Sequence, residues 1–300
     1  MKILVVGATG TLGRHVVAKL LAKGVSVRAL TRSAERAASL AAHGAEVVVG
    51  DLIDAHSLRL ACMGVDRILA SAHGLLGQGR YRSENVDGAG HFSLLAAARD
   101  AGVGRFVYVS ARGASPHHPV DFFRTKHAIE VALAASGLDW VVLRPTAFME
   151  QHVHAFNGAR FLAEGCSQLI GPGTKKRNFV ASEDVADVAV RGLLDEKPIH
   201  TIEIGGPGNY SNLDVMELYA RMVGREPRAK HLPVGVARLL SLATAFANPG
   251  RARILKLMSL GEDAHPEQFF GSAELERTYG VRMTTVEAFV RACVEKYLRS

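Results

Sequence analysis

Three glycines near the start of the chain have the spacing of a loop that binds phosphate groups. They lie in the segment Lys2-Ile-Leu-Val-Val-Gly-Ala-Thr-Gly-Thr-Leu-Gly. An apolar run precedes them and a helical pattern follows, so a strand would turn through Gly7 directly into a helix. Gly10 would let the backbone approach a pyrophosphate, which the free N–H groups at the helix N-terminus would bind. We therefore predict a dinucleotide here; the alternative is a glycine turn without a ligand. The expected contacts are Gly7, Thr9, Gly10, Thr11, Leu12 and Gly13.

The residue that ends the second apolar run indicates which dinucleotide binds. Proteins that bind NAD usually place an acidic residue there, about 20 residues after the glycines. This chain has Arg32 instead. A guanidinium pairs with the 2′-phosphate that only NADP carries. We therefore expect NADP(H) in preference to NAD(H); the alternative is an ordinary surface arginine at a strand end.

Residues that follow the third and fourth apolar runs are expected to contact the same cofactor. Asp51 could accept a hydrogen bond from the adenine amine, or it could cap the next helix, although Asp54 is better placed for capping. Leu52 and Ser71 follow or end these runs and are assigned to the cofactor as well.

Lys126 interrupts an otherwise apolar helical stripe formed by Phe122, Ile129 and Leu133. The spacing of i, i+4, i+7 and i+11 places all four residues on one face of the helix. A lysine on a face turned toward the core must find a partner. We expect that partner to be the cofactor ribose; the alternative is an ion pair with Glu130, one turn further along.

The elements that must position these residues are short apolar strands alternating with helices. The strands are apolar almost throughout, which is typical of a parallel sheet covered on both faces. The predicted fold is therefore a Rossmann-type, doubly wound α/β fold. The expected strands are Ile3–Val6, Val25–Thr31, Glu46–Val49, Arg67–Ser71, Arg105–Ser110 and Trp140–Leu143. The expected helices are Leu12–Lys23, Ser33–His43, Asp54–Met63, Asn85–Ala101 and Val120–Ser136.

After Pro145 the alternation becomes less regular, which indicates a smaller, mainly helical C-terminal lobe. We expect a nucleotide-binding domain at 1–150 and a substrate lobe at 151–300, with about 177–205 returning to the main sheet. The expected helices are Ala147–Ala163, one from Ser182 to about Leu194, Asn212–Val223, a core or partner-facing helix at Val236–Ala247, and Thr285–Leu298; Thr201–Ile204 is a short strand.

Composition excludes several classes of protein. The net charge is +7, but the basic residues are scattered and Lys175-Lys176-Arg177 is the only run, so we expect a solvated loop there and no nucleic acid. The three cysteines have neither metal-ligand spacing nor an even count, which fits a reducing, cytoplasmic compartment without metal. No apolar stretch reaches the ~18 residues of a membrane span. A homodimer could form through Phe92–Ala98 or Ile129–Leu133, and Arg251, Arg253 and Lys256 could face a protein partner.

Four motifs together resemble the extended and atypical short-chain dehydrogenase/reductases, most closely their NmrA-like branch. They are Gly7-Ala-Thr-Gly10-Thr-Leu-Gly13, Asn85-Val-Asp-Gly88, Arg105-Phe-Val-Tyr-Val-Ser110 and Leu143-Arg-Pro145. The resemblance covers most of residues 1–205 and implies a Ser, a Tyr and a Lys at the catalytic centre. Ser110 and Lys126 match two of these, whereas Phe122 stands where the tyrosine is expected. The residues expected to face substrate are His73, Phe122, Phe148 and His152.

The resulting hypothesis is an NADPH-dependent reductase of a small carbonyl, enone or quinone. Lys126 would orient the ribose and Ser110 would bind the substrate oxygen or the carboxamide. Water, Tyr81 or one of several histidines would replace the missing phenol as proton donor. A quinone fits best because it needs less acid assistance than a ketone. The alternative is a cofactor-binding sensor or accessory subunit without turnover, which Phe122 favours.

Overall fold

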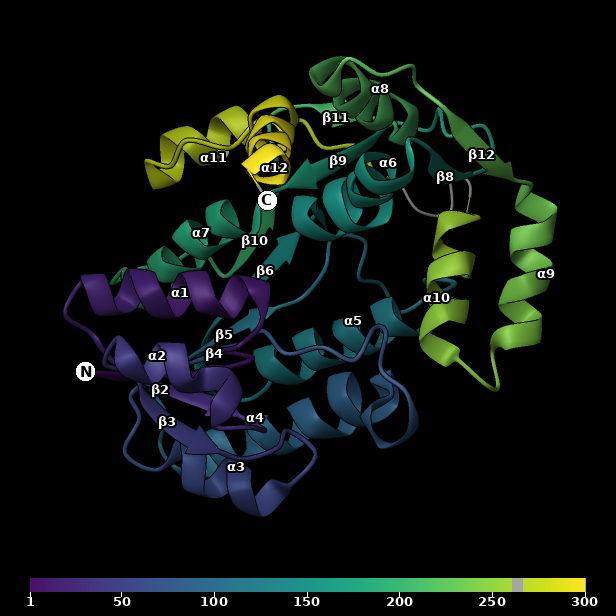
Figure 1. The fold of residues 1–300 in the computed structure, drawn as a ribbon. Helices are drawn as coiled ribbons and strands as arrows, with labels where there is room; N and C mark the ends of the chain where they lie inside the picture. Colours follow the sequence, from purple (N-terminus) through teal and green to yellow (C-terminus); the bar gives the residue numbers. More distant parts are fainter. Residues whose placement is uncertain (261–266, 300) are drawn as a thin grey trace. The chain divides into compact units, whose positions relative to one another are not determined.

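A seven-stranded sheet, built mainly from the first half of the chain, is the largest sheet of the computed structural model, which describes residues 1–260 and 267–299 (Figure 1). The strand order is β10-β6-β5-β4-β1-β2-β3, and the pairs from β3 through β6 are parallel. The order reverses between β1 and β4, and ligands of doubly wound folds bind at such a reversal. The strands are β1 (Lys2–Val6), β2 (Ser26–Thr31), β3 (Glu46–Val49), β4 (Arg67–Ala70), β5 (Arg105–Val109), β6 (Asp139–Pro145) and β10 (Thr201–Ile204).

Helices cover both faces of this sheet, which explains its apolar strands. On one face, Leu58, Leu94 and Ile129 pack with Leu4 and Phe106 in one buried cluster. The helices are α1 (Thr11–Ala22), α2 (Ala38–Ala42), α3 (Ala55–Cys62), α4 (His91–Asp100), α5 (Asp121–Ala134) and α7 (Ser182–Leu194). The predicted doubly wound α/β fold is confirmed.

Two compact units make up the described chain. The first contains Met1–Arg144 and Val185–Glu203; the second contains Pro145–Asp184 and the described residues from Ile204 onward. Of the segment 177–205, β10 pairs beside β6 in the main sheet, whereas β9 (Arg177–Val180) forms a three-stranded sheet with β7 (Ala147–Phe148) and β11 (Asn209–Tyr210).

The second unit is mainly helical and has a core of its own. Phe161, Phe179 and Tyr219 are fully buried in it. Strand β8 (Ser167–Ile170) pairs in parallel with β12 (Ala229–Leu232). The helices are α6 (Ala159–Glu164), α8 (Asn212–Val223), α9 (Val234–Thr244), α10 (Pro249–Met258), α11 (Ser272–Tyr279) and α12 (Val286–Arg299).

Several expected elements differ from those observed. The helix expected at Ser33–His43 is a 3₁₀ turn at Glu35–Ala37 followed by the short α2. The helix expected at Asn85–Ala101 begins as a π-helix over Glu84–Gly90. Ala147–Phe148, expected to be helical, pairs with β9, and the helix then starts as a π-helix at Glu150–Gly158. Residues 147–148 have no local signal for a strand, because their pairing partners lie about 30 residues away.

His91 is a buried titratable group at the start of α4. It is fully buried, its Nδ1 lies 2.8 Å from the carbonyl oxygen of Val86, and its ring meets Tyr108 edge-on. Burial, reinforced by the nearby Lys126 ammonium, lowers the pKa of His91 to about 4. The histidine therefore stays neutral in the folded protein at pH values where it is already protonated in the unfolded chain.

Replacing His91 should reduce the loss of stability in acid. Between pH 6.5 and 4 the unfolded chain binds a proton that the folded protein does not, so the free energy of unfolding falls as the pH falls. At pH 5 this term is about 2 kcal/mol, and His91→Gln should remove it. Urea unfolding at pH 7 and pH 5 measures the difference, with the exposed His56→Gln as control. Equal pH differences in all three proteins would show that His91 is not the responsible group.

Candidate functional site

The loop between β1 and α1 has the geometry of a phosphate cradle. Gly7 has a φ of +89°, a left-handed conformation that favours glycine, and the Gly10 N–H donates to its carbonyl at 2.9 Å. A Cβ on Gly13 would lie 2.1 Å from the carbonyl oxygen of Gly7, so only glycine lets the helix approach the loop this closely. The sequence pattern thus has a physical cause at two of its three glycines.

The N-terminus of α1 leaves backbone donors without partners in the helix. Gly10 is the N-cap, no side chain caps it, and the first turn contains no acidic residue. The N–H groups of Thr11, Leu12 and Gly13 therefore point out of the helix without acceptors within it. Arg14 donates from Nε to the carbonyl of Thr9 at 3.0 Å, which holds the loop and places a cation beside these donors. Such an end suits an anion.

The exposed Arg32 follows β2 and stacks on an aromatic ring. Its guanidinium carbon lies 4.4 Å from the ring centroid of Tyr81, and the guanidinium carbon of Arg80 lies 5.3 Å from the same centroid. The Tyr81 hydroxyl donates to Oδ2 of Asp51 at 3.0 Å. Two guanidinium groups and one carboxylate thus gather around one ring.

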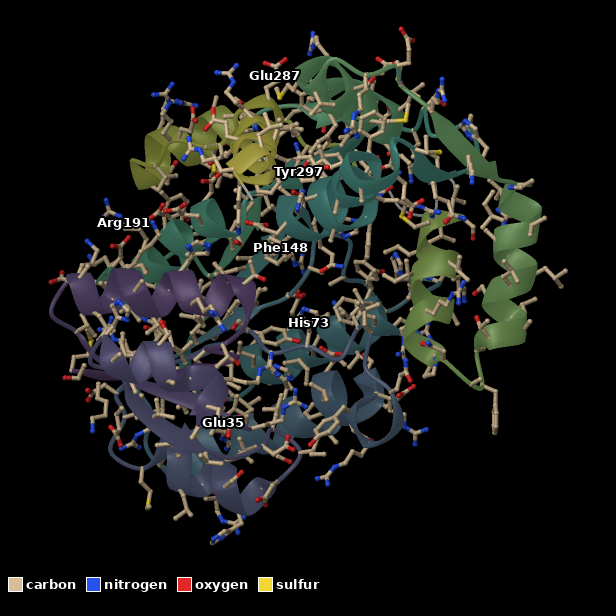
Figure 2. The ribbon with its side chains drawn as sticks, viewed as in Figure 1. Glu35, His73, Phe148, Arg191, Glu287 and Tyr297 are labelled. Carbon is tan, nitrogen blue, oxygen red and sulfur yellow. The ribbon has the colours of Figure 1, made fainter. Side chains whose placement is uncertain are left out.

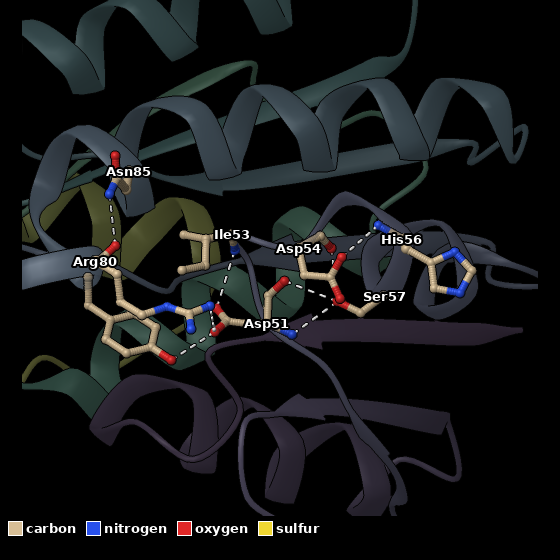
Figure 3. A network of polar contacts seen from close by, with 8 residues as sticks. Asp51, Ile53, Asp54, His56, Ser57, Arg80 and Asn85 are labelled. Carbon is tan, nitrogen blue, oxygen red and sulfur yellow. Dashed lines mark hydrogen bonds and ion pairs between the residues drawn. The ribbon is translucent and has the colours of Figure 1, made fainter.

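Asp51 also organises the start of α3, as Figure 3 shows. Its Oδ1 accepts from the N–H of Ile53, and its own N–H donates to the hydroxyl of Ser57. Asp54 is the N-cap of α3 and accepts from the N–H of His56, so the preference for Asp54 as the capping residue is confirmed. The assignment of Asp51 to the adenine amine stays a prediction.

Leu52 and Ser71 contact backbone near the glycine loop and the π-helix. Leu52 is buried, and a Cβ on Gly90 would lie 2.8 Å from its Cγ. The hydroxyl of Ser71 donates to the carbonyl of Val6 at 2.9 Å, directly beneath the glycine loop. Leu52 thus packs closely against Gly90, and Ser71 binds the Val6 carbonyl. The contact of either side chain with a cofactor stays a prediction.

Lys126 is buried and paired with a carboxylate that the sequence did not indicate. Its Nζ donates to the carbonyl oxygen of Val109 at 3.0 Å and lies 3.6 Å from Oδ1 of Asp87, whose side chain is fully buried. Oδ2 of Asp87 accepts from the N–H of Gly74 and from the hydroxyl of Ser83. Burial lowers the pKa of Lys126, and the charge of Asp87 acts in the opposite direction. The expected apolar stripe is confirmed, since Phe122, Ile129 and Leu133 are buried with Lys126.

Glu130 pairs with Arg144, so the alternative of a Lys126–Glu130 ion pair is wrong. Nε and Nη2 of Arg144 donate to the two carboxylate oxygens at 3.0 and 2.6 Å, a bidentate arrangement that raises the pKa of Arg144. The buried hydroxyl of Ser110 donates to Oε1 of the same carboxylate. Ser110 is therefore held in one orientation by Glu130. Ile129 and Leu133 are buried but Val131 is 55% exposed, so a dimer face over 129–133 stays a prediction.

Phe122 and His73 lie together at the position of the expected tyrosine. The ring of Phe122 lies 5.4 Å below the Lys126 ammonium, and the exposed ring of His73 meets it edge-on with 6.4 Å between centroids. Figure 2 labels His73. Of the expected substrate residues, these two come from the first unit and are brought together.

Phe148 and His152 belong to the second unit (Figure 2 labels Phe148). Phe148 is half-buried in β7 and pairs with Val180. His152 packs edge-on against Phe156, and burial lowers its pKa to about 3, helped by the charge of Arg177. An imidazole with so low a pKa stays neutral and is a poor proton donor near neutral pH.

Neither a metal site nor a membrane span is found among the residues that the structure describes. No group of three or more His, Cys, Asp or Glu side chains is arranged to hold a metal ion. No described helix is both long and apolar enough to cross a bilayer.

The fold and the glycine loop define a Rossmann-type α/β protein of the short-chain dehydrogenase/reductase kind. The sequence matches the NmrA-like family over residues 1–294, and the chain belongs to that family. The resemblance seen in the sequence motifs is thereby confirmed.

The proteins that this chain resembles have names that describe different functions. An NAD(P)H azoreductase of Xenophilus azovorans is 31% identical over 255 residues, which is 81% of this chain and 84% of that protein. The photosystem II assembly factor Ycf39 of Synechocystis sp. is 29% identical over 247 residues, 82% of this chain and 75% of that protein. The NADPH-dependent quinone oxidoreductase of Escherichia coli, solved with NADPH, has a TM-score of 0.78 at 22% identity, covering 98% of this chain and 100% of that one.

Proposed function

We propose that this protein is an NADPH-dependent reductase of a small quinone, enone or carbonyl compound. The observation that carries the proposal is the pairing of the glycine cradle, whose first-turn N–H groups lack helical acceptors, with the exposed Arg32 after β2. The names of the azoreductase and the quinone oxidoreductase support reduction as the reaction class.

The proposed roles follow from the contacts of each residue. The N-terminus of α1 and Arg14 would hold the pyrophosphate, and Arg32 would pair with the 2′-phosphate. Lys126 would donate to the nicotinamide ribose, because Val109 takes one of its three N–H donors and Asp87 faces another. NADPH, when bound, would supply the hydride.

The proton would come from His73 or from water that His73 orients. His73 is exposed and lies beside Phe122, which has no proton to give. Ser110 would bind the substrate oxygen only by giving up its hydrogen bond to Glu130. A quinone suits this arrangement, since its reduced oxygens are stabilised as anions and need little acid assistance.

NADPH oxidation in the presence of quinones, enones and aldehydes tests the proposal, with NADPH affinity titrated in parallel. We expect turnover on at least one quinone. His73→Gln should lower kcat more at low pH than at high pH, because only the protonated imidazole can give a proton and desolvation lowers the pKa of His73. The exposed His56→Gln serves as the matched control. Tight NADPH binding without turnover on any compound would contradict the reductase proposal.

A second candidate function is a cofactor-dependent sensor or accessory subunit. Phe122 favours it, because the phenol that donates the proton in the family is missing, and Lys126 already has structural partners in Val109 and Asp87. The name of the photosystem II assembly factor adds support. This candidate predicts that exchanging NADPH for NADP⁺ changes the affinity for a protein partner, whereas the reductase proposal requires turnover.

A further inference from the structure

The buried residues of helix α9 are small, and its large apolar residues are mostly exposed. Ala237 and Ser241 are its buried residues, and the hydroxyl of Ser241 donates to the carbonyl of Ala252 in α10 at 2.9 Å. Their spacing of i and i+4 puts both on one side of α9, and the two helices lie side by side (Figure 1). We call residues 234–258 the α9–α10 hairpin. The side of α9 that faces its neighbour is therefore the side with the least apolar surface.

The opposite side of α9 is a continuous apolar face. Leu239 and Leu242 are 66% and 76% exposed, and Phe246, in the turn after the helix, is fully exposed. Val236 and Leu240 extend the face and are exposed as well. Single exposed apolar residues are common on protein surfaces, but a contiguous set on one helix indicates an interaction site. These side chains therefore leave apolar surface open to a partner.

The charged residues of the segment that contains this face are all basic. The sequence from Pro227 to Leu260 contains six Lys and Arg residues and no Asp or Glu, so it carries +6 of the chain's net +7. Lys230, Arg238 and Arg251 are exposed. An apolar face on a segment whose charged residues are all basic is the pattern of a helix that lies in a membrane interface.

We propose that the α9–α10 hairpin docks this protein on the surface of an anionic lipid bilayer. Leu239, Leu242 and Phe246 enter the boundary between headgroups and acyl chains, while the flanking basic residues contact anionic headgroups. Helix α9 has 11 residues, which is too short to span a bilayer, so the hairpin lies on the membrane and does not cross it.

The charge of the hairpin favours an anionic bilayer over a second copy of the chain as its partner. A symmetric dimer through the hairpin would place the same surface on both sides, so two segments of charge +6 would meet without an acidic residue between Pro227 and Leu260 to compensate. Nucleic acid would match the charge but would leave the leucines and the phenylalanine without a role. An anionic bilayer matches both the charge and the apolar face. The proposal does not depend on the reaction that the protein catalyses.

Co-sedimentation of the full chain with vesicles tests the proposal. We expect binding to mixed phosphatidylcholine–phosphatidylglycerol vesicles, weaker binding to phosphatidylcholine alone, and a decrease with added salt. Leu242→Ser combined with Phe246→Ser should weaken binding by about tenfold or more. Arg251→Glu combined with Lys230→Glu should weaken it by at least about 25-fold, since each basic residue near an anionic surface contributes about fivefold.

Matched controls come from exposed residues of α3 and α4. Leu60→Ser with Phe92→Ser makes the same two residue changes at partly exposed positions, and Arg59→Glu with Arg99→Glu reverses two charges. Both control proteins should bind vesicles as the wild type does. The proposal is overturned if the hairpin variants bind like the controls, if anionic lipid makes no difference, or if sedimentation velocity shows a dimer that the Leu242/Phe246 variant dissociates.

Discussion

Replacing Lys126 by methionine should lower the free energy of unfolding by about 3–5 kcal/mol, because it leaves the fully buried carboxylate of Asp87 without its cation. The backbone N–H of Gly74 and the hydroxyl of Ser83 remain as donors to Asp87, but neither carries a charge. Urea unfolding at pH 7 measures the loss. Lys19→Met is the matched control: its ion pair with Asp187 is partly exposed, so the cost should be about 1 kcal/mol or less.

The double variant Lys126→Met, Asp87→Asn separates the ion pair from the packing around it. Asparagine can still accept from Gly74 and Ser83 through its carbonyl oxygen, and no buried charge is left. We expect it to recover most of the stability that Lys126→Met loses, since replacing both members of a buried pair is often nearly neutral. A double variant as unstable as the sum of the two single ones would show that the residues are not coupled. If Lys126→Met does not fold, Asp87→Asn can be measured instead, because it also removes one member of the ion pair.

Replacing Arg32 by alanine should weaken NADPH binding by about 10–100-fold and leave NADH binding almost unchanged. The guanidinium is exposed beside the ring of Tyr81, and a charge-assisted pair with the 2′-phosphate is worth about 1.5–3 kcal/mol. NADH has no phosphate at that position. Fluorescence titration with both cofactors measures the two affinities.

Two further variants make this measurement specific. Arg99→Ala removes an exposed arginine of α4 and should change neither affinity. Tyr81→Phe keeps the ring beside Arg32 but removes the hydroxyl that binds Asp51, so it reports on Asp51 separately from the phosphate. Equal losses for NADPH and NADH in Arg32→Ala would contradict the proposed cofactor preference.

Residues with a local signal could be predicted from the sequence. The glycine loop is defined by seven consecutive residues, and its steric cause, the contact between Gly13 and the Gly7 carbonyl, lies within the same segment. The stripe of Phe122, Lys126, Ile129 and Leu133 follows from the helical repeat alone, and all four residues are buried.

Partners that are distant along the chain could not be predicted in the same way. Asp87 reaches Lys126 across 39 positions, from a π-helical turn that the apolar pattern does not distinguish from an α-helix. Tyr81 reaches Asp51 and Arg32 from a loop with no periodicity. Glu130 lies one turn from Lys126, which favoured an ion pair between them, but the bidentate geometry of Arg144 on β6 binds it instead. In each case the partner is determined by tertiary packing and not by spacing along the chain.

The contact between Lys126 and Asp87 also limits how this site can change during evolution. A substitution of either residue alone leaves an isolated charge in the interior, so selection for a folded protein retains both. The tyrosine position is under no such constraint, because Phe122 packs in the same place without a polar partner. Phenylalanine at position 122 is therefore compatible with the fold, while Lys126 and Asp87 depend on each other for stability. The presence of Lys126 in this chain is therefore no evidence of catalysis by itself, and only measured turnover would show an enzyme.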